Sequence, residues 1–484
     1  MVSGTLAAID LGATSGRVML GWVAPNELRI RQVARFPNTP VRTADGLHWD
    51  IRGLYAHAID GLAAALREEP ELASIAVDSW ACDYGLLRDG QLLSQPFHYR
   101  DDRTAAAIGQ VHSKIGAAEL YAVNGLQHLP FNTVFQLIAD RSSGALDRAD
   151  GFLMIPDLIA WWLTGRRGAE TTNASTTGLL GVRSRLWDDA LIERVDLPRS
   201  IFPELIEAGT EIGQVRRSVA LEIGASAHLT VTAVGSHDTA SAIVAVPATR
   251  EDFAYISCGT WSLVGVELDG PQVSEAGRRA GFTNEGGVDG RVRYLHNVMG
   301  LWLLSESVRT WEGGGEPVDL PALLREASTV SGVVFDPDDP RFLPPGDIPA
   351  RIAALCLEHG IALPNSRAGL VRSILDSLAH AYARALRKAV ELTGKTVSVV
   401  HMVGGGSQNE LLCQLTADCT GLPVLAGPAE ATSIGNILIQ ARAQRLVTGS
   451  LESLRALVST GFRPVLYRPR RGTVQRYRTD KPSQ

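Results

Sequence analysis

The sequence has little that would direct the protein to a membrane, to nucleic acid or to an oxidising compartment. It contains no stretch of about 18 apolar residues that could span a bilayer. Basic residues are not in surplus, since the net charge is −6, so neither nucleic acid nor an anionic membrane is favoured as a partner. Only five cysteines occur and no two form a Cys-x-x-Cys pair. A zinc site or a disulfide framework is therefore not expected.

The first ten residues do not show the pattern expected of a secretion signal. Residues Met1–Asp10 carry no basic start, and Asp10 interrupts the apolar run, so we expect no signal peptide. The chain is long and has 45% hydrophobic residues, which suffices for two or three sizeable cores. We expect a soluble cytoplasmic enzyme with reduced thiols.

The first half of the chain shows the pattern of an α/β domain. Apolar runs at Leu6–Ile9, Val18–Val23 and Leu28–Phe36 predict a three-strand meander with a glycine-rich first turn. Residues Ile51–Arg67 place apolar side chains at helical spacing, and Ser74–Val77 predicts another strand, which ends at Asp78. Strands that lead to acidic residues and alternate with helices favour a mixed sheet flanked by helices.

A similar hairpin follows in the second half. Phe253–Ser257 predicts a strand, Cys258–Ser262 a tight turn with a Gly-Thr pair, and Leu263–Leu268 the returning strand. We interpret the two hairpins as an internal duplication, although they could also be unrelated. The boundary would fall close to Pro247, which gives an N-terminal domain over 1–247 and a C-terminal domain over 248–484.

The C-terminal domain contains a second glycine-rich segment. A helix over Leu370–Leu392 is stopped by Gly394, and a strand over Val397–Val403 follows. The next residues, Gly404–Asn409, precede a predicted helix at Glu410–Thr420. A glycine-rich turn between a strand and a helix lets a ligand approach the backbone and offers it free amides. We therefore expect nucleotide contacts from Gly404, Gly405, Gly406, Ser407 and Asn409.

The sharpest motif is Asp10-Leu-Gly-Ala-Thr-Ser-Gly-Arg17. We expect Gly12 and Gly16 to turn successive amides into one concavity, with hydroxyl donors from Thr14 and Ser15 and a positive charge from Arg17. Asp10 could hold Mg²⁺ through water, because magnesium prefers carboxylates and keeps much of its hydration shell. The alternative is an ordinary hairpin turn.

Asp238, within Ser236-His-Asp-Thr239, is the candidate general base. It lies between two apolar runs, and a carboxylate at such a position could deprotonate a sugar hydroxyl during phosphoryl transfer. Alternatively, Ser236 or Thr239 caps the following helix, with Asp238 in its first turn.

Two further segments are ambiguous. Asp78-Ser-Trp-Ala-Cys-Asp83 combines two acids with an indole, which suits a polyol pocket but equally a strand end with a core tryptophan. Asn297 interrupts an apolar stretch and is a ligand contact or a satisfied buried amide.

Together these segments resemble the FGGY carbohydrate kinases and, within that family, the bacterial L-rhamnulose kinases. The resemblance covers the chain from Ala8 to about Ala441. It rests on these ordered segments: Ala8–Leu20, Pro130–Thr133, Pro156–Asp157, Thr172–Thr177, Ser236–Ser241, Ser257–Leu263, Asn284–Gly287, Asn297–Leu304 and Val403–Asn409.

The resemblance implies a fold of two actin-like (ribonuclease H-like) domains with the active-site cleft between them. It implies transfer of the ATP γ-phosphate to the 1-hydroxyl of L-rhamnulose, with Asp238 as the proton acceptor. By the same resemblance, the phosphates would contact Ala13, Thr14, Ser15, Gly16, Arg17 and Thr260, and the nucleotide would lie against Gly405. The ketose would contact His237, Thr239 and Asn297.

Three positions depart from the family pattern. Ala81 replaces a glycine whose backbone commonly meets the sugar, which puts the choice among ketoses in doubt. Ser305 replaces a glutamine that is usual near the nucleotide. Cys258 replaces a serine, and we interpret Cys258 as a buried thiol.

Alternative functions are a kinase for L-fuculose or a pentulose and, more distantly, a non-catalytic sugar sensor or an actin-like ATPase. We expect a monomer or a homodimer.

Overall fold

The computed structural model of the protein describes residues 3–226 and 228–470. Their contacts group them into two compact units that interleave along the chain. Unit 1 runs up to residue 249 and adds residues 265–297 and 430–463. Unit 2 takes residues 250–264 and 298–429 and continues from residue 464. The predicted domain division between residues 247 and 248 stays a prediction.

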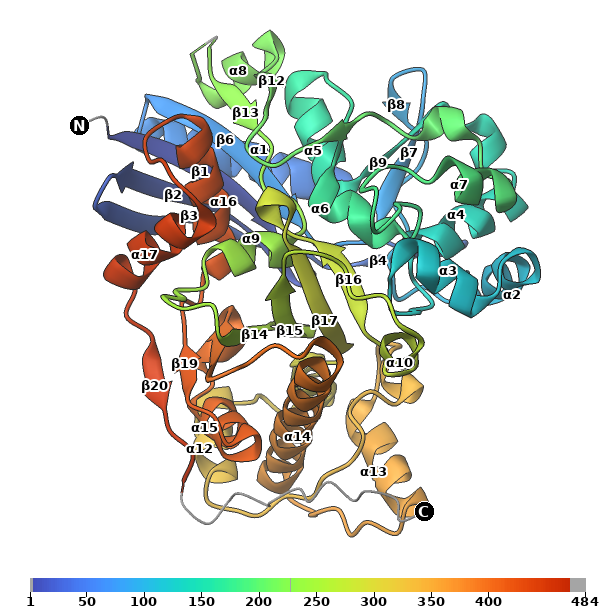
Figure 1. Cartoon of the computed structure of the whole chain (residues 1–484), viewed down its shortest axis with the longest axis vertical. Coiled ribbons are helices and arrows are strands. Elements are labelled where there is room, and N and C mark those ends of the chain that lie inside the picture. The colour runs from blue at the N-terminus through green and yellow to red at the C-terminus, as the bar shows by residue number, and fades with distance from the viewer. Residues whose placement is uncertain (1–2, 227, 471–484) are drawn as a thin grey trace. The chain divides into compact units, whose positions relative to one another are not determined.

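Unit 1 is built on a six-stranded sheet with the predicted meander at one end (Figure 1). Strands β1, β2 and β3 pair antiparallel in sequence order, while β6 pairs parallel to the other side of β1. The predicted strands are confirmed and lie within three residues of the observed bounds. In sheet order the strands are β12 (Glu211–Gln214), β13 (Thr230–Thr232), β6 (Leu72–Ser79), β1 (Gly4–Leu11), β2 (Ser15–Ala24) and β3 (Glu27–Pro37).

Helices cover both faces of this sheet because side chains alternate along each strand. Val18 of β2 faces Gly61 of α1, whereas Gly21 of the same strand faces Ile437 of α16, so the two helices lie on opposite faces. The helices of this layer are α1 (Ile51–Glu68), α5 (Ile155–Thr164), α8 (Arg217–Ile223), α9 (Asp238–Val244), α16 (Ala431–Ala443) and α17 (Leu451–Gly461).

Unit 1 also contains a smaller lobe with its own core. Its sheet has the order β8–β7–β9, and a hydrophobic cluster that includes Phe135, Phe152 and Trp187 packs against it. The elements of the lobe and its surroundings are β7 (Tyr84–Arg88), β8 (Gln91–Leu92), β9 (Gly151–Met154), α2 (Ala105–Lys114), α3 (Ala117–Asn124), α4 (Thr133–Ser142), α6 (Thr171–Ala174), α7 (Asp189–Arg194) and α10 (Glu275–Arg279). Short strand pairs are β4 (Val41–Thr43) with β5 (Gly46–His48) and β10 (Ala169–Glu170) with β11 (Leu205–Ile206).

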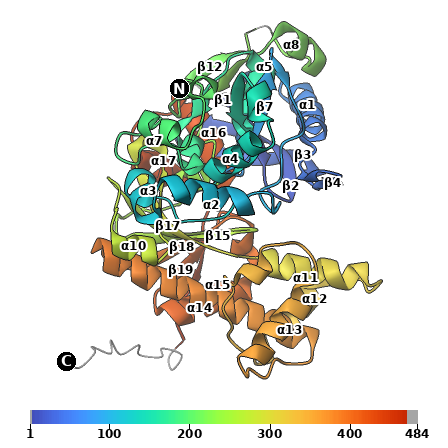
Figure 2. The ribbon, with the colours of Figure 1, turned by 90° about the vertical axis from the view of Figure 1, so that its right-hand side faces the viewer.

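The second large sheet has the order β16–β17–β15–β14–β18–β19–β20. In unit 2, α11, α12 and α13 gather beside the long helix α14 (Figure 2). Gly394 ends α14 with φ 68°, as predicted. The elements are β14 (Phe253–Cys258), β15 (Ser262–Leu268), β16 (Thr283–Gly286), β17 (Val292–Val298), β18 (Val399–Val403), β19 (Val424–Ala426), β20 (Val465–Tyr467), α11 (Trp302–Gly313), α12 (Leu320–Ala327), α13 (Ile348–Glu358), α14 (Arg367–Thr393) and α15 (Glu410–Thr420).

The two sheets repeat one strand order. In the first, β2, β1, β6, β13 and β12 are neighbours, with β6 and β13 parallel to β1 and β12 antiparallel. In the second, β15, β14, β18, β19 and β20 are neighbours with the same directions after β14. This agreement supports the internal duplication that the two hairpins indicated. No helix within the described ranges is long and apolar enough to cross a bilayer.

Candidate active site

The predicted phosphate loop is the tight turn between β1 and β2. The Gly12 amide donates to the Ser15 carbonyl at 3.0 Å, which closes the turn. Asn38, just after β3, donates its side-chain amide to the Gly12 carbonyl at 2.9 Å and its backbone amide to the Thr14 carbonyl at 3.0 Å. Thr14 is exposed, and Ala13 and Ser15 are partly exposed. A rigid turn thus presents its tip to a ligand.

The two glycines of this loop make room for neighbouring atoms. Neither Gly12 nor Gly16 has a positive φ, and the amide concavity predicted for them stays a prediction. A Cβ on Gly16 would lie 2.2 Å from the Phe36 ring, so this glycine makes room for an aromatic side chain on β3. A Cβ on Gly12 would lie 3.1 Å from the Ser15 carbonyl oxygen, so Gly12 permits the tight turn.

Asp10 and Arg17 face each other across the hairpin. Their Cα positions pair in the β1–β2 ladder, and Arg17 Nε donates to Asp10 Oδ2 at 2.9 Å. Arg17 Nη1 also lies 2.7 Å from a carboxylate oxygen of Glu430, and Ser433 donates to Asp10 Oδ2 at 2.8 Å. The positive charge expected to meet a polyphosphate is therefore already held between two carboxylates.

Helix α16 supplies several polar residues that the sequence reasoning did not identify. Asn436 donates to Asp78 Oδ2 at 2.6 Å, and Gln440 donates to the Ala7 carbonyl at 3.0 Å. Ser433, Asn436 and Gln440 follow each other at one-turn spacing on a mostly apolar helix, so they form a single face. Buried polar residues at such spacing on an apolar helix are the signal that could have found them.

Asp78 is a buried acid at the end of β6. Its Oδ1 has no hydrogen-bond partner among the described residues. Burial, followed by the charge of the neighbouring Asp10, raises the pKa of Asp78 well above its usual range. The charge of Asp238 adds to this rise, so three carboxylates influence one another at this end of the sheet.

The acids of this region do not form a closed metal cage. Within residues 3–226 and 228–470, no group of three or more His, Cys, Asp or Glu side chains is arranged to hold a metal ion directly. The donor set nevertheless suits a hydrated divalent cation, because Asp10 and Asp78 are acids that Arg17 alone does not neutralise.

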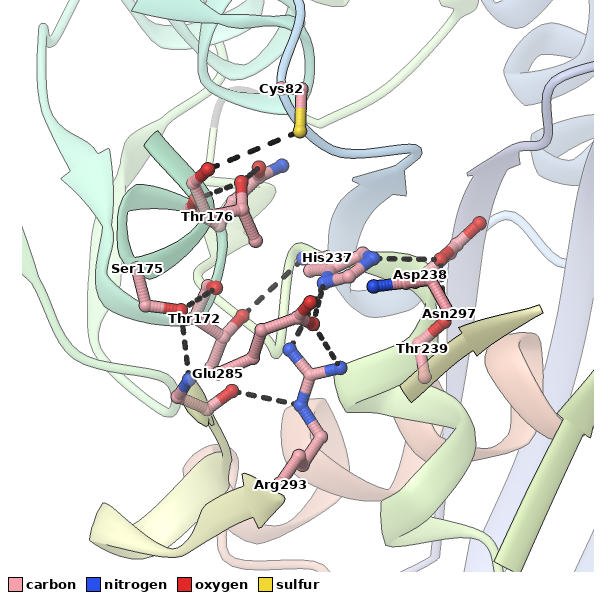
Figure 3. Close-up of polar contacts among 12 residues, drawn as sticks. Cys82, Thr172, Ser175, Thr176, His237, Asp238, Thr239, Glu285, Arg293 and Asn297 are labelled. Atoms are coloured by element: carbon pink, nitrogen blue, oxygen red, sulfur yellow. Dashed lines mark hydrogen bonds and ion pairs between the residues drawn. The ribbon is translucent and has the colours of Figure 1, made fainter. Parts of the chain in front are cut away.

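Asp238 is the first residue of α9. Two side-chain groups approach its Oδ1: the Thr239 hydroxyl donates to it at 3.1 Å, and His237 Nε2 lies 3.4 Å away (Figure 3). The Asp238 side chain is 30% exposed. Burial raises its pKa, His237 opposes the rise and Asp10 adds to it. Neither Ser236 nor Thr239 caps α9, so the capping alternative is wrong for both, while Asp238 does lie in the first turn.

Glu170 holds the segment that leads into Asp238. Its carboxylate accepts hydrogen bonds from the amide and the hydroxyl of Ser236, both at 2.9 Å, and from the amide and hydroxyl of Thr172 at 3.0 and 2.5 Å. The Thr172 hydroxyl in turn accepts from the His237 amide at 3.3 Å. Glu170 is buried, and burial raises its pKa. The backbone before Asp238 is therefore fixed by a side chain that the sequence reasoning missed.

His237 is held by an ion pair on the hairpin of β16 and β17. Glu285 and Arg293 are cross-strand partners, with Arg293 Nη1 3.0 Å from Glu285 Oε2. Arg293 Nη2 lies 3.0 Å from His237 Nδ1 (Figure 3). Burial alone would raise the pKa of Glu285, but the charge of Arg293 and the contact with His237 lower it below the usual value.

Asn297, the other predicted ketose contact, is oriented by Gln127. The Gln127 side-chain oxygen accepts from the backbone amide of Asn297 at 3.1 Å and from its side-chain amide at 3.0 Å. Asn297 is partly exposed. Because Gln127 accepts from both the backbone amide and the side-chain amide of Asn297, it fixes the orientation of this side chain.

Within the segment Asp78–Asp83, Trp80 and Asp83 are buried, whereas Ala81 is partly exposed to solvent. Asp83 is buried and accepts from the indoles of Trp49 and Trp80 at 2.6 and 3.0 Å, with Tyr99 and Gln136 as further donors. The structural alternative therefore holds for Asp83 and Trp80. Ala81 is partly exposed, and its sugar contact stays a prediction.

In unit 2, the turn after β14 packs against the glycine-rich segment. Cys258 is buried, as expected, and a Cβ on Gly406 would lie 2.1 Å from its sulfur. A Cβ on Gly404, where φ is 84°, would lie 2.9 Å from the Cys258 carbonyl oxygen. Gly405 is exposed and a Cβ there would meet nothing within 4 Å. The two segments predicted to contact the nucleotide thus lie together, with Gly405 open to a ligand.

The remaining predicted nucleotide residues differ in accessibility. Thr260 is partly exposed, and its carbonyl accepts from the Trp302 amide at 3.0 Å. Ser305 is exposed in the first turn of α11. Ser407 donates to the Gly404 carbonyl at 2.7 Å, and Asn409 caps α15 by accepting from the Leu412 amide at 3.0 Å. Ser407 and Asn409 therefore have structural roles, and their contact with a nucleotide stays a prediction.

Known proteins are similar to this chain in sequence and in architecture. The family model for the N-terminal domain of the FGGY family of carbohydrate kinases matches residues 5–245, and that for the C-terminal domain matches residues 254–444. A rhamnulokinase of Bacteroides thetaiotaomicron is 39% identical over 467 residues, 96% of this chain and 95% of that protein. A rhamnulokinase of Pectobacterium atrosepticum is 40% identical over 474 residues, 96% of this chain and 93% of that protein.

Solved structures show the same fold at low identity. A ligand-bound xylulose kinase from Lactobacillus acidophilus has a TM-score of 0.79 and 14% identity, covering 96% of this chain and 94% of that chain. Plasmodium falciparum glycerol kinase with ADP has a TM-score of 0.75 and 14% identity, covering 96% and 94%. The predicted fold of two actin-like domains is thereby confirmed, as is the predicted resemblance. From its sequence and fold, this chain belongs to the FGGY family of carbohydrate kinases and is an ATP-dependent sugar kinase.

Proposed function

We propose that this kinase transfers the γ-phosphate of ATP to the 1-hydroxyl of L-rhamnulose and that Asp238 is the general base. The curated relatives described above are rhamnulokinases that match 96% of the chain. The contacts of Asp238 support its role as the general base. Its Oδ1 accepts from Thr239 and faces His237, and we propose that Oδ2 takes the proton of the sugar hydroxyl.

The chemistry requires little beyond position and charge. Phosphoryl transfer depends mainly on aligning the hydroxyl with the phosphorus and on neutralising the phosphate oxygens. Asp238 would orient the 1-hydroxyl and accept its proton, and the raised pKa makes its carboxylate a better base than an exposed one. His237, Thr239 and Asn297 would bind the ketose, with Ala81 beside them.

We assign the phosphates to the turn at Ala13–Arg17, in which Thr14 is exposed, and to Thr260. We assign the nucleotide to Gly404–Ser407, Asn409 and Ser305. Asp10 would hold Mg²⁺ through water, a role that the surplus of carboxylates around Arg17 supports. When bound, Mg²⁺ neutralises charge on the phosphates. The protein's own part is to orient Asp10 through Arg17 and Ser433.

The direct test of the base is Asp238→Asn. We expect turnover to fall by roughly two to four orders of magnitude, while nucleotide binding measured by calorimetry stays within about twofold. Thr239→Val is the matched control, because it removes one donor to Oδ1 and keeps the carboxylate. A near-normal rate in Asp238→Asn would exclude Asp238 as the base.

The acceptor needs its own experiment, because one methylene in a pocket is worth only about 1–3 kcal/mol. We would compare kcat/KM for L-rhamnulose with the values for L-fuculose, L-xylulose and L-ribulose. L-rhamnulose should be preferred; a higher value for another ketose would reassign the substrate without affecting the kinase assignment. ADP release without any sugar would instead indicate an ATPase. We also propose a cytoplasmic location. We propose that the protein is a monomer or a homodimer, and sizing chromatography tests this oligomeric state.

A further inference from the structure

Arg293 contacts His237, the residue beside the proposed base Asp238. We infer that Arg293 is a positioning residue, which keeps the proton of the neutral His237 ring on Nε2, where it faces Asp238. The inference rests on the proposed function in one respect: it takes Asp238 as the base.

The assignment follows from what a guanidinium can do. Arginine has only donors, so the contact of 3.0 Å from Arg293 Nη2 requires a lone pair on His237 Nδ1. In a neutral ring the single proton must then be on Nε2. Glu285 Oε2 also lies 3.3 Å from Nδ1 and could attract a proton there. Its charge is shared with Arg293, whose Nη1 is 3.0 Å from the same oxygen.

The guanidinium is fixed in place. Arg293 is fully buried, and its Nε donates to the Gly286 carbonyl at 2.9 Å. With Nη1 against Glu285 and Nη2 against His237, each of its nitrogens has a neighbour of suitable charge or polarity. A buried arginine that is held at three points cannot easily turn away from Nδ1.

The histidine is fixed as well. Its backbone amide donates to the Thr172 hydroxyl at 3.3 Å, and its backbone forms a parallel bridge with Ser79. Ser236, just before it, is bound to Glu170 by two hydrogen bonds. The ring is 7% exposed. Rotation of the ring would bury a polar nitrogen away from Arg293, so the observed orientation is the one that the surroundings select.

The consequence reaches Asp238 through Nε2. This nitrogen is 3.4 Å from Asp238 Oδ1, and a proton on it faces the carboxylate favourably. If the proton were on Nδ1, a lone pair would face the carboxylate instead and repel it. Together with the Thr239 hydroxyl at 3.1 Å, the Nε2 proton holds Oδ1 and aims Oδ2 at the ketose. An aligned base is worth more than the same base free to rotate.

The tautomer can be measured on the unaltered protein. Two-dimensional ¹⁵N–¹H spectra of histidine-labelled enzyme at pH 8, assigned with His237→Gln, report which ring nitrogen carries the proton. We expect a protonated Nε2 and an unprotonated Nδ1 for His237. A proton on Nδ1, or on both nitrogens, would overturn the inference. This readout does not depend on which residue is the base, so it separates the inference from the proposed function.

A pair of isosteres tests whether the Nε2 proton matters for turnover. The amide nitrogen of glutamine occupies the place of Nε2, whereas that of asparagine occupies the place of Nδ1. His237→Gln should therefore keep a kcat roughly 10- to 100-fold higher than His237→Asn, which is the effect of one hydrogen bond to a charged group. Equal kcat values would overturn the positioning role.

Arg293 itself is tested in a charge-balanced background, because removing it alone would leave Glu285 buried without a partner. In Arg293→Met with Glu285→Gln, Nδ1 loses its donor and kcat should fall by roughly 10- to 100-fold. KM for ATP should be unchanged. Arg293→Lys, which keeps a donor and the charge, should recover part of the rate. A merely structural role would lower stability without this split between kcat and KM, and that result would overturn the inference.

Discussion

Asp10 and Asp78 are paired Cα positions on the parallel strands β1 and β6, and each carboxylate receives a hydrogen bond from helix α16. Ser433 donates to Asp10 and Asn436 donates to Asp78. Burial and the neighbouring charge of Asp10 both disfavour the ionised form of Asp78, and its pKa is raised as a result. The helix therefore contributes to the site by supplying donors where two acids meet.

The contact between Asn436 and Asp78 can be tested by exchanging the two groups. Asn436→Asp adds a second carboxyl beside Asp78 and should lower the free energy of unfolding by about 3–5 kcal/mol at pH 8, the cost typical of an uncompensated buried charge. The double variant with Asp78→Asn restores one acid and one amide and should recover most of this loss. Urea unfolding measures both. A double variant no more stable than Asn436→Asp would contradict the pairing.

A second prediction concerns the close approach of α16 and α9. A Cβ on Gly435 would lie 1.8 Å from the Ser241 carbonyl oxygen, a backbone atom that cannot give way alone. Gly435→Ala should therefore destabilise the protein by about 1–3 kcal/mol or more. The matched control is Gly109→Ala in helix α2, where a Cβ would meet nothing within 4 Å. That change should stabilise by about 0.5–1 kcal/mol. Equal effects on the melting temperature would argue against the close contact.

The pH dependence of catalysis follows from the setting of Asp238. Burial raises the pKa of this carboxyl, His237 opposes the rise and Asp10 adds to it. A base must be ionised to accept a proton, so kcat/KM should fall as pH drops through this raised pKa. The acid limb should lie above about pH 4, the ordinary range for aspartate. Circular dichroism at each pH would confirm that the enzyme stays folded, and a limb at or below pH 4 would contradict the prediction.

Asp83 should make a measurable contribution to the pH dependence of stability. Burial raises its pKa to about 6 despite the hydrogen bonds from Gln136, Trp49 and Trp80. Because the folded-state pKa is above the ordinary value, the stabilising effect of its proton is fully present below about pH 4 and is lost as pH rises through 6. The wild type should thus lose up to about 3 kcal/mol from this group between pH 4 and 7.5.

The control for this prediction is Asp83→Asn, which cannot titrate. All other groups titrate alike in both proteins, so the wild type minus variant difference in unfolding free energy should shrink as pH rises. A difference that is constant or that grows between pH 4 and 7.5 would contradict the assignment to Asp83.

The elements that could be predicted are those whose pattern is local. The meander of β1–β3 follows from apolar runs separated by turn residues, and α14 follows from its helical spacing and from Gly394 at its end. Asp238 in the first turn of α9 and the buried Cys258 also follow from neighbouring residues. These features depend on a few consecutive residues, for which sequence reasoning has direct rules.

The residues that were missed act over long distances in the chain. Ser433 contacts Asp10 across 423 positions, Glu170 holds Ser236 across 66, and Arg293 reaches His237 across 56. No local pattern states which distant strand or loop a polar helix face will meet. The role of Gly16 was missed for the same reason, since the Phe36 ring that it accommodates comes from another strand.

The late position of α16 in the chain has a consequence for biosynthesis. A nascent chain emerging from the ribosome presents β1, β2 and β6 early, but the helix that supplies donors to Asp10 and Asp78 begins only at residue 431. Until then, two adjacent acids and one face of the sheet lack their partners. The first strands to be synthesised must therefore wait for nearly the whole polypeptide before their native surroundings are complete.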